Sequence, residues 1–309
     1  MGWIALFPGQ GSQHPGMGKS WYEDFPLVRE LFELASDTLK IDFKKLCFDA
    51  SESELTRTEN AQPSLFLVSY AGYKILKTEL GFSPLAGAGH SLGEYTALVS
   101  AQALEFTDGI KLTRRRGELM AKACEAQSGG MLAVLGLSPE EVKELCQEAS
   151  ESKVLVPANF NAPGQIVISG ELEAIERARE ILKERKKRAI PLKVSGAFHS
   201  LLMESAKKGL EEVLAEVKFA NPKFPVISNL EAKPYPSGDS APHLLASQII
   251  SPVRWEESLY YLKAMKPEGF IEIGPGKVLA GLVKRTLPEM TILNFSESKD
   301  LKELEKILQ

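Results

Sequence analysis

A Gly-x-Ser-x-Gly pentapeptide at residues 89–93 constrains this 309-residue chain more than any other feature. A short segment of apolar residues and glycines precedes it and an apolar-periodic helix follows, which is the strand–turn–helix context of a nucleophile elbow. Gly89 and Gly93 let strand and helix approach closely while Ser91 takes a strained backbone conformation. The N–H of Leu92 then points to the place where an oxyanion forms during acyl transfer. We therefore predict a nucleophilic serine; the alternative is an ordinary serine in a glycine-rich turn.

The N-terminal residues predict a second element of the same site. A buried strand over 3–7 ends abruptly in a loop over 8–13 that is rich in backbone N–H groups. The later segment Gly18-Lys19-Ser20 matches the end of a phosphate-binding P-loop motif. That motif requires glycine where this chain has Gln13, so we exclude a nucleotide site here. Such a loop can instead supply the second oxyanion N–H beside an elbow serine, and Gln10 is the candidate.

A nucleophilic serine needs a general base, and the chain has four histidines. His90 adjoins Ser91, where successive side chains tend to point apart, while His14 and His243 lie in other loops. His199 stands in a loop of small residues before an amphipathic helix. By elimination it is the predicted base, although a single histidine is often structural.

The helix that follows the elbow carries an arginine on its apolar face. Spacing places it in an otherwise apolar row: Leu112, Arg116, Leu119, Met120 and Ala123. A guanidinium on an inward face is costly unless an anion pairs with it. Arg116 therefore either binds a substrate carboxylate, or forms a structural ion pair with an internal Asp or Glu, or extends its charged end to solvent.

Alternating strands and helices predict an α/β fold with a parallel sheet. A helix is expected from Asn60 to a stop at Gly81, with Pro63 in its first turn. Between residues 131 and 194 the order becomes βαββαβ, the ferredoxin-like split pattern. We predict a large hydrolase-like catalytic domain from 1–126 and 195–309, with an inserted ferredoxin-like subdomain at 127–194. The polar hairpin at 159–165 either faces the cleft or forms a turn in which asparagine side chains bond the backbone.

Composition favours a cytoplasmic protein that binds neither nucleic acid nor membrane. The formal net charge is −4, and no segment approaches the roughly 18 apolar residues of a membrane span. The N-terminus lacks the basic region of a secretory signal. Three cysteines, far apart and without a CxxC pair, argue against a disulfide framework or a zinc site, so we expect reduced thiols.

Seven segments together resemble the malonyl-CoA:acyl carrier protein transacylase family of fatty acid synthesis and the related acyltransferase domains of polyketide synthases. They occur in the family's order and span nearly the whole chain. The segments are Phe7-Pro-Gly-Gln-Gly-Ser-Gln13, Gly89-His-Ser-Leu-Gly-Glu-Tyr95, Arg116-Gly117, Asn159-Phe-Asn-Ala-Pro-Gly-Gln165, Gly196-Ala-Phe-His-Ser200, Gln248 before Pro252-Val-Arg-Trp255, and Glu272-Ile-Gly-Pro-Gly276.

The resemblance implies a ping-pong transfer of a malonyl group from malonyl-CoA to the phosphopantetheine thiol of acyl carrier protein, with no metal or redox cofactor required. It implies that Ser91 carries the malonyl ester and that His199 takes and returns the proton. It further implies that Arg116 pairs with the malonyl carboxylate and that the backbone carbonyl of Gln248 orients His199. It also implies that the backbone N–H groups of Gln10 and Leu92 form the oxyanion hole. Separately, we expect a monomer.

We make a separate hypothesis about Phe198: its side chain narrows the pocket and so excludes an acyl group with a 2-methyl branch. Two other functions stay open at this stage. A serine esterase or thioesterase on the same scaffold would pass the acyl group to water and would ordinarily place an Asp or Glu between Ser91 and His199 in sequence. A non-catalytic module that binds the carrier protein would use Arg116 and the basic run at 183–188 for docking.

Overall fold

Strand β1 (Trp3–Phe7) lies at the centre of a five-stranded sheet in which every neighbouring pair is parallel. The computed structural model describes residues 2–308. The strand order is β7-β2-β1-β8-β9. The other strands are β2 (Ala86–Gly89), β7 (Val226–Ile227), β8 (Gly269–Ile273) and β9 (Thr291–Phe295). An α/β fold with a parallel sheet is thereby confirmed.

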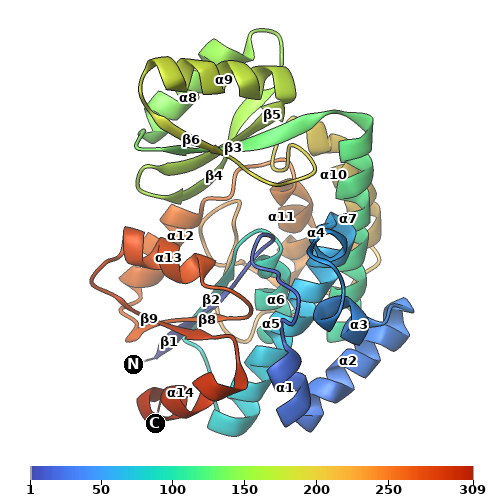
Figure 1. The fold of residues 1–309 in the computed structure, drawn as a ribbon. Coiled ribbons are helices and arrows are strands. Elements are labelled where there is room, and N and C mark those ends of the chain that lie inside the picture. The colour runs from blue at the N-terminus through green and yellow to red at the C-terminus, as the bar shows by residue number, and fades with distance from the viewer. Residues whose placement is uncertain (1, 309) are drawn as a thin grey trace.

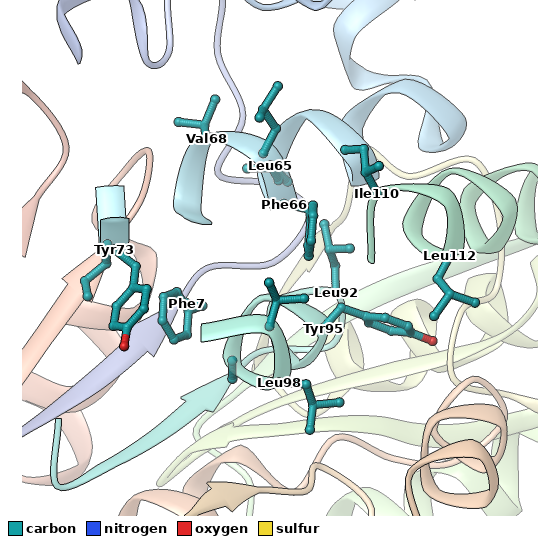
Figure 2. Packing of buried hydrophobic residues seen from close by; sticks show 14 of the residues in the cluster. Phe7, Leu65, Phe66, Val68, Tyr73, Leu92, Tyr95, Leu98, Ile110 and Leu112 are labelled. Atoms are coloured by element: carbon teal, nitrogen blue, oxygen red, sulfur yellow. The ribbon is translucent and has the colours of Figure 1, made fainter. Parts of the chain in front are cut away.

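Helices cover both faces of this sheet, because β1 sends alternate side chains to opposite sides. Trp3, Ala5 and Phe7 join the larger apolar cluster, and Ile4 and Leu6 join a second one. The first cluster includes residues of α1 (Lys19–Asp24), α2 (Pro26–Leu39), α3 (Phe43–Phe48), α4 (Glu52–Thr56), α5 (Thr58–Leu80), α6 (Gly93–Ser100), α7 (Phe106–Ala126), α10 (Glu204–Leu214), α11 (Ala241–Gln248) and α14 (Leu301–Leu308). The second includes residues of α12 (Trp255–Ala264) and α13 (Val278–Thr286). Figure 2 shows side chains of α5 and α6 around Phe7, with Ile110 and Leu112 of α7 elsewhere in the same cluster.

A second sheet lies above the first in Figure 1, with two helices on its outer face. Its order is β4-β5-β3-β6, and all neighbouring pairs are antiparallel. The elements follow one another as β3 (Gly129–Leu135), α8 (Pro139–Ser150), β4 (Leu155–Ala162), β5 (Gln165–Glu171), α9 (Leu172–Glu184) and β6 (Arg188–Pro191). This is the predicted ferredoxin-like βαββαβ arrangement, and it lies within residues 127–194. The exact domain bounds stay a prediction.

One face of the small sheet packs against its own two helices, and the other face packs against the large domain. Leu132 and Val134 of β3 pack in a cluster that includes α8 and α9, whereas Met131 and Ala133 belong to the large cluster. A serine–glutamate capping box at Ser138 fixes the start of α8. The inner face of the small sheet is therefore placed over the large domain.

The start of α5 differs from the prediction. The helix begins at Thr58 rather than Asn60, so Pro63 lies inside it and not in its first turn. Proline has no N–H to donate to the carbonyl four residues earlier, which here is that of Glu59. Arg114 of α7 donates to this carbonyl instead, at 2.9 Å. A contact from a distant helix thus makes the interior proline tolerable.

Three short 3-10 helices complete the described elements: η1 (Leu201–Met203), η2 (Gly238–Ser240) and η3 (Ser298–Asp300). Within residues 2–308 no helix combines the length and the apolar character that crossing a membrane demands.

Candidate active site

The elbow between β2 and α6 has the geometry that its glycines predicted. Ser91 has a φ of +50°, in the left-handed region that residues other than glycine rarely adopt. A Cβ added to Gly89 would lie 1.8 Å from the backbone carbon of Gly93, and one added to Gly93 would lie 2.1 Å from the carbonyl oxygen of Phe7. Strand, turn and helix therefore meet with backbone against backbone, and the turn presents Ser91 to the space between the two sheets.

Asn229, in the loop after β7, stabilises this strained turn through two hydrogen bonds. Its Oδ1 accepts from the Ser91 N–H at 2.6 Å, and its Nδ2 donates to the Gly89 carbonyl at 2.7 Å. Both bonds are formed where the backbone leaves regular structure, so they offset part of the conformational cost of the turn. Sequence analysis missed this residue.

His199 lies next to the serine, with its Nε2 2.9 Å from Ser91 Oγ. Its Nδ1 faces two backbone carbonyl oxygens, those of Gln248 at 2.9 Å and Ser251 at 3.1 Å. Carbonyls only accept, so Nδ1 carries the proton and Nε2 is free to accept from the serine hydroxyl. Burial and then the positive charge of Arg116 lower the pKa of His199 to about 3, so the imidazole is neutral at pH 7.

Arg116 points its guanidinium at the same serine. Its side chain is 1% exposed and donates to Ser91 Oγ at 2.9 Å, Gln62 Oε1 at 2.8 Å and Gln248 Oε1 at 2.9 Å. Burial rules out an extended side chain that reaches solvent. Among the described residues no carboxylate lies within 4.0 Å of it, so three neutral oxygens surround a buried cation. That arrangement leaves Arg116 able to pair with an incoming anion.

The two predicted oxyanion donors belong to segments that meet at the elbow, and the aim of their N–H groups at a reacting carbonyl stays a prediction. Leu92 is the N-cap residue of α6, where the first N–H groups have no partner within the helix. Gln10 follows Gly9, and a Cβ on Gly9 would lie 2.3 Å from the carbonyl oxygen of His90, so the loop after β1 packs directly on the elbow. Thr58 anchors the Gln10 side chain by accepting its Nε2–H at 3.3 Å.

A cleft of about 280 Å³ opens over these groups between the two sheets. Met131 and Val167 of the small sheet form part of its apolar wall, together with Phe198, which is 6% exposed. The hairpin that the sequence left undecided faces the cleft through Asn159, Asn161 and Gln165. Within it, Asn161 Oδ1 lies 2.8 Å from Nε2 of His90.

Glu94 is a second residue that sequence analysis did not single out as functional, although it is the one charged residue of α6. It is fully buried and accepts from Gln248 Nε2 at 2.7 Å, from the Asn229 N–H at 3.0 Å and from the Tyr235 hydroxyl. Burial raises its pKa to about 7, and these hydrogen bonds oppose the shift. A lone acid in an apolar helix was the available signal.

The fold and the site together define a class of protein. A serine on a strained elbow, a neutral histidine within hydrogen-bond distance and a helix that begins directly after the serine form the arrangement of enzymes that transfer acyl groups through a serine ester. The buried cation beside the serine is an addition to that common plan.

Comparison with known proteins defines the family. The chain belongs to the acyl transferase domain family, whose model matches residues 4–305, and it is an acyltransferase. It is 46% identical over 298 residues to a malonyl CoA-acyl carrier protein transacylase of Bacillus subtilis, covering 96% of this chain and 94% of the relative. The family resemblance seen in the seven sequence segments is confirmed.

Solved structures of relatives have the same fold. A malonyl CoA-acyl carrier protein transacylase of Clostridium perfringens superposes with a TM-score of 0.95 at 39% identity, covering 99% of this chain and 97% of that one. A malonyl-transacylase in complex with a type II polyketide synthase acyl-carrier protein superposes with a TM-score of 0.96 at 37% identity, covering 99% of this chain and all of the other.

Proposed function

We propose that the protein transfers the malonyl group of malonyl-CoA to the phosphopantetheine thiol of acyl carrier protein, through a malonyl ester of Ser91. One observation carries this proposal: a buried guanidinium, that of Arg116, lies 2.9 Å from the hydroxyl to which the acyl group would be attached. A short acyl group with a carboxylate at its far end would replace the neutral partners of that cation. The relatives named above, and the complex of one of them with a carrier protein, support the same substrates.

Acylation begins with proton transfer from Ser91 Oγ to Nε2 of His199 as the oxygen attacks the thioester carbonyl. The N–H groups of Gln10 and Leu92 stabilise the resulting oxyanion. The carbonyls of Gln248 and Ser251 stabilise the imidazolium, in place of the carboxylate of the usual triad. The imidazolium then returns its proton to the sulfur of CoA, which leaves.

Deacylation repeats these steps with the carrier's thiol. The thiol gives its proton to His199 and attacks the malonyl ester, and the imidazolium protonates Ser91 Oγ as it leaves. Every proton and electron pair comes from the substrates, Ser91 or His199, so the proposed reaction includes no metal or redox cofactor. A malonyl carboxylate on Arg116 also offsets the positive charge that helps to hold the pKa of His199 low, and this makes the base stronger when the correct substrate is bound.

Hydrolysis is the alternative outcome. A serine esterase or thioesterase would ordinarily hold its histidine with an acidic side chain. In the described part of the chain Nδ1 of His199 contacts two carbonyl oxygens instead. This observation favours transfer over the hydrolase with an acidic triad.

Intact mass spectrometry tests the proposal. Malonyl-CoA should add one malonyl group to the wild-type protein, none to Ser91→Ala and little to Arg116→Ala, and holo acyl carrier protein should then remove it. Free malonate without a malonylated carrier would indicate the hydrolase. Absence of both adduct and turnover would leave only a module that binds the carrier.

We further propose that the enzyme is a cytoplasmic monomer that binds no nucleic acid. The net charge of −4 supports the last point. Light scattering at the concentration of the assay tests the oligomeric state, and a dimer would contradict it.

A further inference from the structure

The buried carboxyl group of Glu94 has no part in the proton transfers proposed above, yet it is linked to the acid-binding residue. The Gln248 amide lies between the two: Nε2 donates to Glu94 at 2.7 Å and Oε1 accepts from Arg116 at 2.9 Å. One amide group therefore separates a buried carboxylate from a buried guanidinium.

These two groups balance each other in the free site. Glu94 contacts α11 through Gln248 and the segment after β7 through Asn229 and Tyr235, and it faces Arg116 of α7 across the Gln248 amide. Of these four neighbours only Arg116 is charged at pH 7. Burial raises the pKa of Tyr235 and that of the adjacent Tyr95 on α6, so both phenols are neutral, and the nearby bases His90 and His199 have lowered pKa values.

A substrate carboxylate disturbs this balance. Once it pairs with Arg116, the site holds two negative charges and one positive charge, all removed from water. An uncompensated buried charge is costly, and a buried acid avoids that cost by taking up a proton. The Tyr235 hydroxyl can either donate to the ionised Glu94 or accept from the protonated acid, so the hydrogen-bond network accommodates both forms.

We propose that Glu94 is a specificity-determining residue, the counter-charge of Arg116, which weakens the binding of a substrate carboxylate and takes up a proton when that carboxylate binds. The inference rests on the proposed recognition of malonyl by Arg116. The pKa of about 7 for Glu94 supports it, since protonation is then nearly free at pH 6 and costs about tenfold in binding at pH 8.

Glu94→Gln tests the proposal because it removes the charge and keeps the shape. The measured quantity is kcat/KM for acylation of Ser91 by malonyl-CoA divided by that for acetyl-CoA, at pH 6 and pH 8. Because kcat/KM reports the ionisation of the free enzyme, which is common to both donors, effects of pH on the serine and its base cancel in this ratio. The wild-type ratio should fall by up to about tenfold between pH 6 and pH 8. The ratio for Glu94→Gln should stay constant and exceed the wild-type ratio at pH 8.

Glu272→Gln is the matched control. Glu272 is also fully buried, in β8, and accepts from the N–H groups of Leu279 and Ala280 at 3.0 and 2.8 Å. Its variant should lose stability as any buried carboxylate would, but its malonyl-to-acetyl ratio should follow the wild type at both pH values. A ratio independent of pH in the wild type overturns the proposal. So does a lower ratio for Glu94→Gln than for the wild type at pH 8, because Glu94 would then assist Arg116.

A binding measurement supplies the second readout. Calorimetry of Ser91→Ala in buffers of different ionisation enthalpy should show proton uptake with malonyl-CoA beyond that with acetyl-CoA at pH 8, and none of this excess in Ser91→Ala/Glu94→Gln. An excess that persists in the double variant overturns the proposal.

Tyr235→Phe serves as a second variant if Glu94→Gln fails to fold. It removes a hydrogen-bond donor to the ionised Glu94 carboxylate, so the pH at which the malonyl-to-acetyl ratio falls should increase. If that pH is the same as in the wild type, the proposal is overturned. A wild-type protein that malonyl-CoA does not acylate would refute the proposed function, whereas an acylated protein with a pH-independent ratio refutes only this inference.

Discussion

Replacing Asn229 by alanine should separate the strain of the elbow from its chemistry. The substitution removes the acceptor of the Ser91 N–H, 2.6 Å away, and the donor to the Gly89 carbonyl, 2.7 Å away. Each buried group left without a partner costs about 1–3 kcal/mol, so the loss of both partners should lower the free energy of unfolding by about 2–6 kcal/mol. That is a large part of the 5–15 kcal/mol typical of a folded protein.

The catalytic effect should exceed what the stability loss explains. Without Asn229 the Ser91 backbone can relax from its φ of +50°, which moves Oγ away from His199. Because a displacement of about 1 Å can cost roughly 100-fold in rate, we expect a loss of that order in kcat, with a nearly unchanged KM for malonyl-CoA. Stopped-flow acylation and urea unfolding measure the two effects.

Asn294→Ala is the control for this experiment. Asn294 also donates from Nδ2 to a backbone carbonyl, that of Gly276 at 2.9 Å. Its loss should lower stability and leave kcat unchanged. A folded Asn229→Ala protein with kcat within threefold of the wild type would refute the view that this residue holds the nucleophile in place.

Three further predictions concern the base, the pocket and the proline of α5. In the unfolded protein His199 takes up a proton below pH 6.5, whereas in the folded protein it does so only near pH 3. The free energy of unfolding should therefore fall by about 1.4 kcal/mol per pH unit as the pH is lowered between these two values. His199→Gln should therefore gain stability relative to the wild type between pH 6.5 and 5 in urea unfolding, and a constant difference would contradict the buried, neutral base. Phe198→Ala should raise the kcat/KM of methylmalonyl-CoA relative to malonyl-CoA, and an unchanged ratio would exclude Phe198 as the barrier to a 2-methyl branch. Arg114→Met should lower the unfolding free energy by about 1–3 kcal/mol because it leaves the Glu59 carbonyl unpaired. Arg115 is half-exposed, so Arg115→Met should change the unfolding free energy by less than about 0.5 kcal/mol. Equal effects of the two substitutions would show that the Glu59 carbonyl finds another partner.

Local backbone rules made the elbow predictable from sequence. Glycine is required at 89 and 93 because backbone atoms occupy the space that a side chain would need, and these two glycines lie only four positions apart in the sequence. The inward arginine was predictable for a similar reason, since helical spacing alone places Arg116 among apolar residues. The βαββαβ order likewise follows from patterns of local hydrophobicity.

The supports of the site could not be predicted in this way. Asn229 contacts residues 138 and 140 positions away, and an asparagine after a strand is typical of any turn. Glu94 and Gln248 are partners across 154 positions. The same holds for Pro63, whose placement inside α5 depends on Arg114 of another helix. Such contacts depend on tertiary packing: the lone acid of α6 marks Glu94 as unusual, but nothing local in the sequence identifies its partners.

The edge of the small sheet has a consequence for the folding of the chain. Strand β4 is an outer strand of that sheet, yet Val253 from the large domain pairs with it: its N–H donates to the Ala158 carbonyl and its carbonyl accepts from the Phe160 N–H, both at 2.9 Å. Exposed edge strands recruit other chains and promote aggregation. Val253 lies almost 60 residues beyond the insert, so a nascent chain would leave this edge open until the C-terminal part of the large domain is synthesised. Truncation before Val253 should therefore yield an insert that self-associates, although every residue of its own sheet is present.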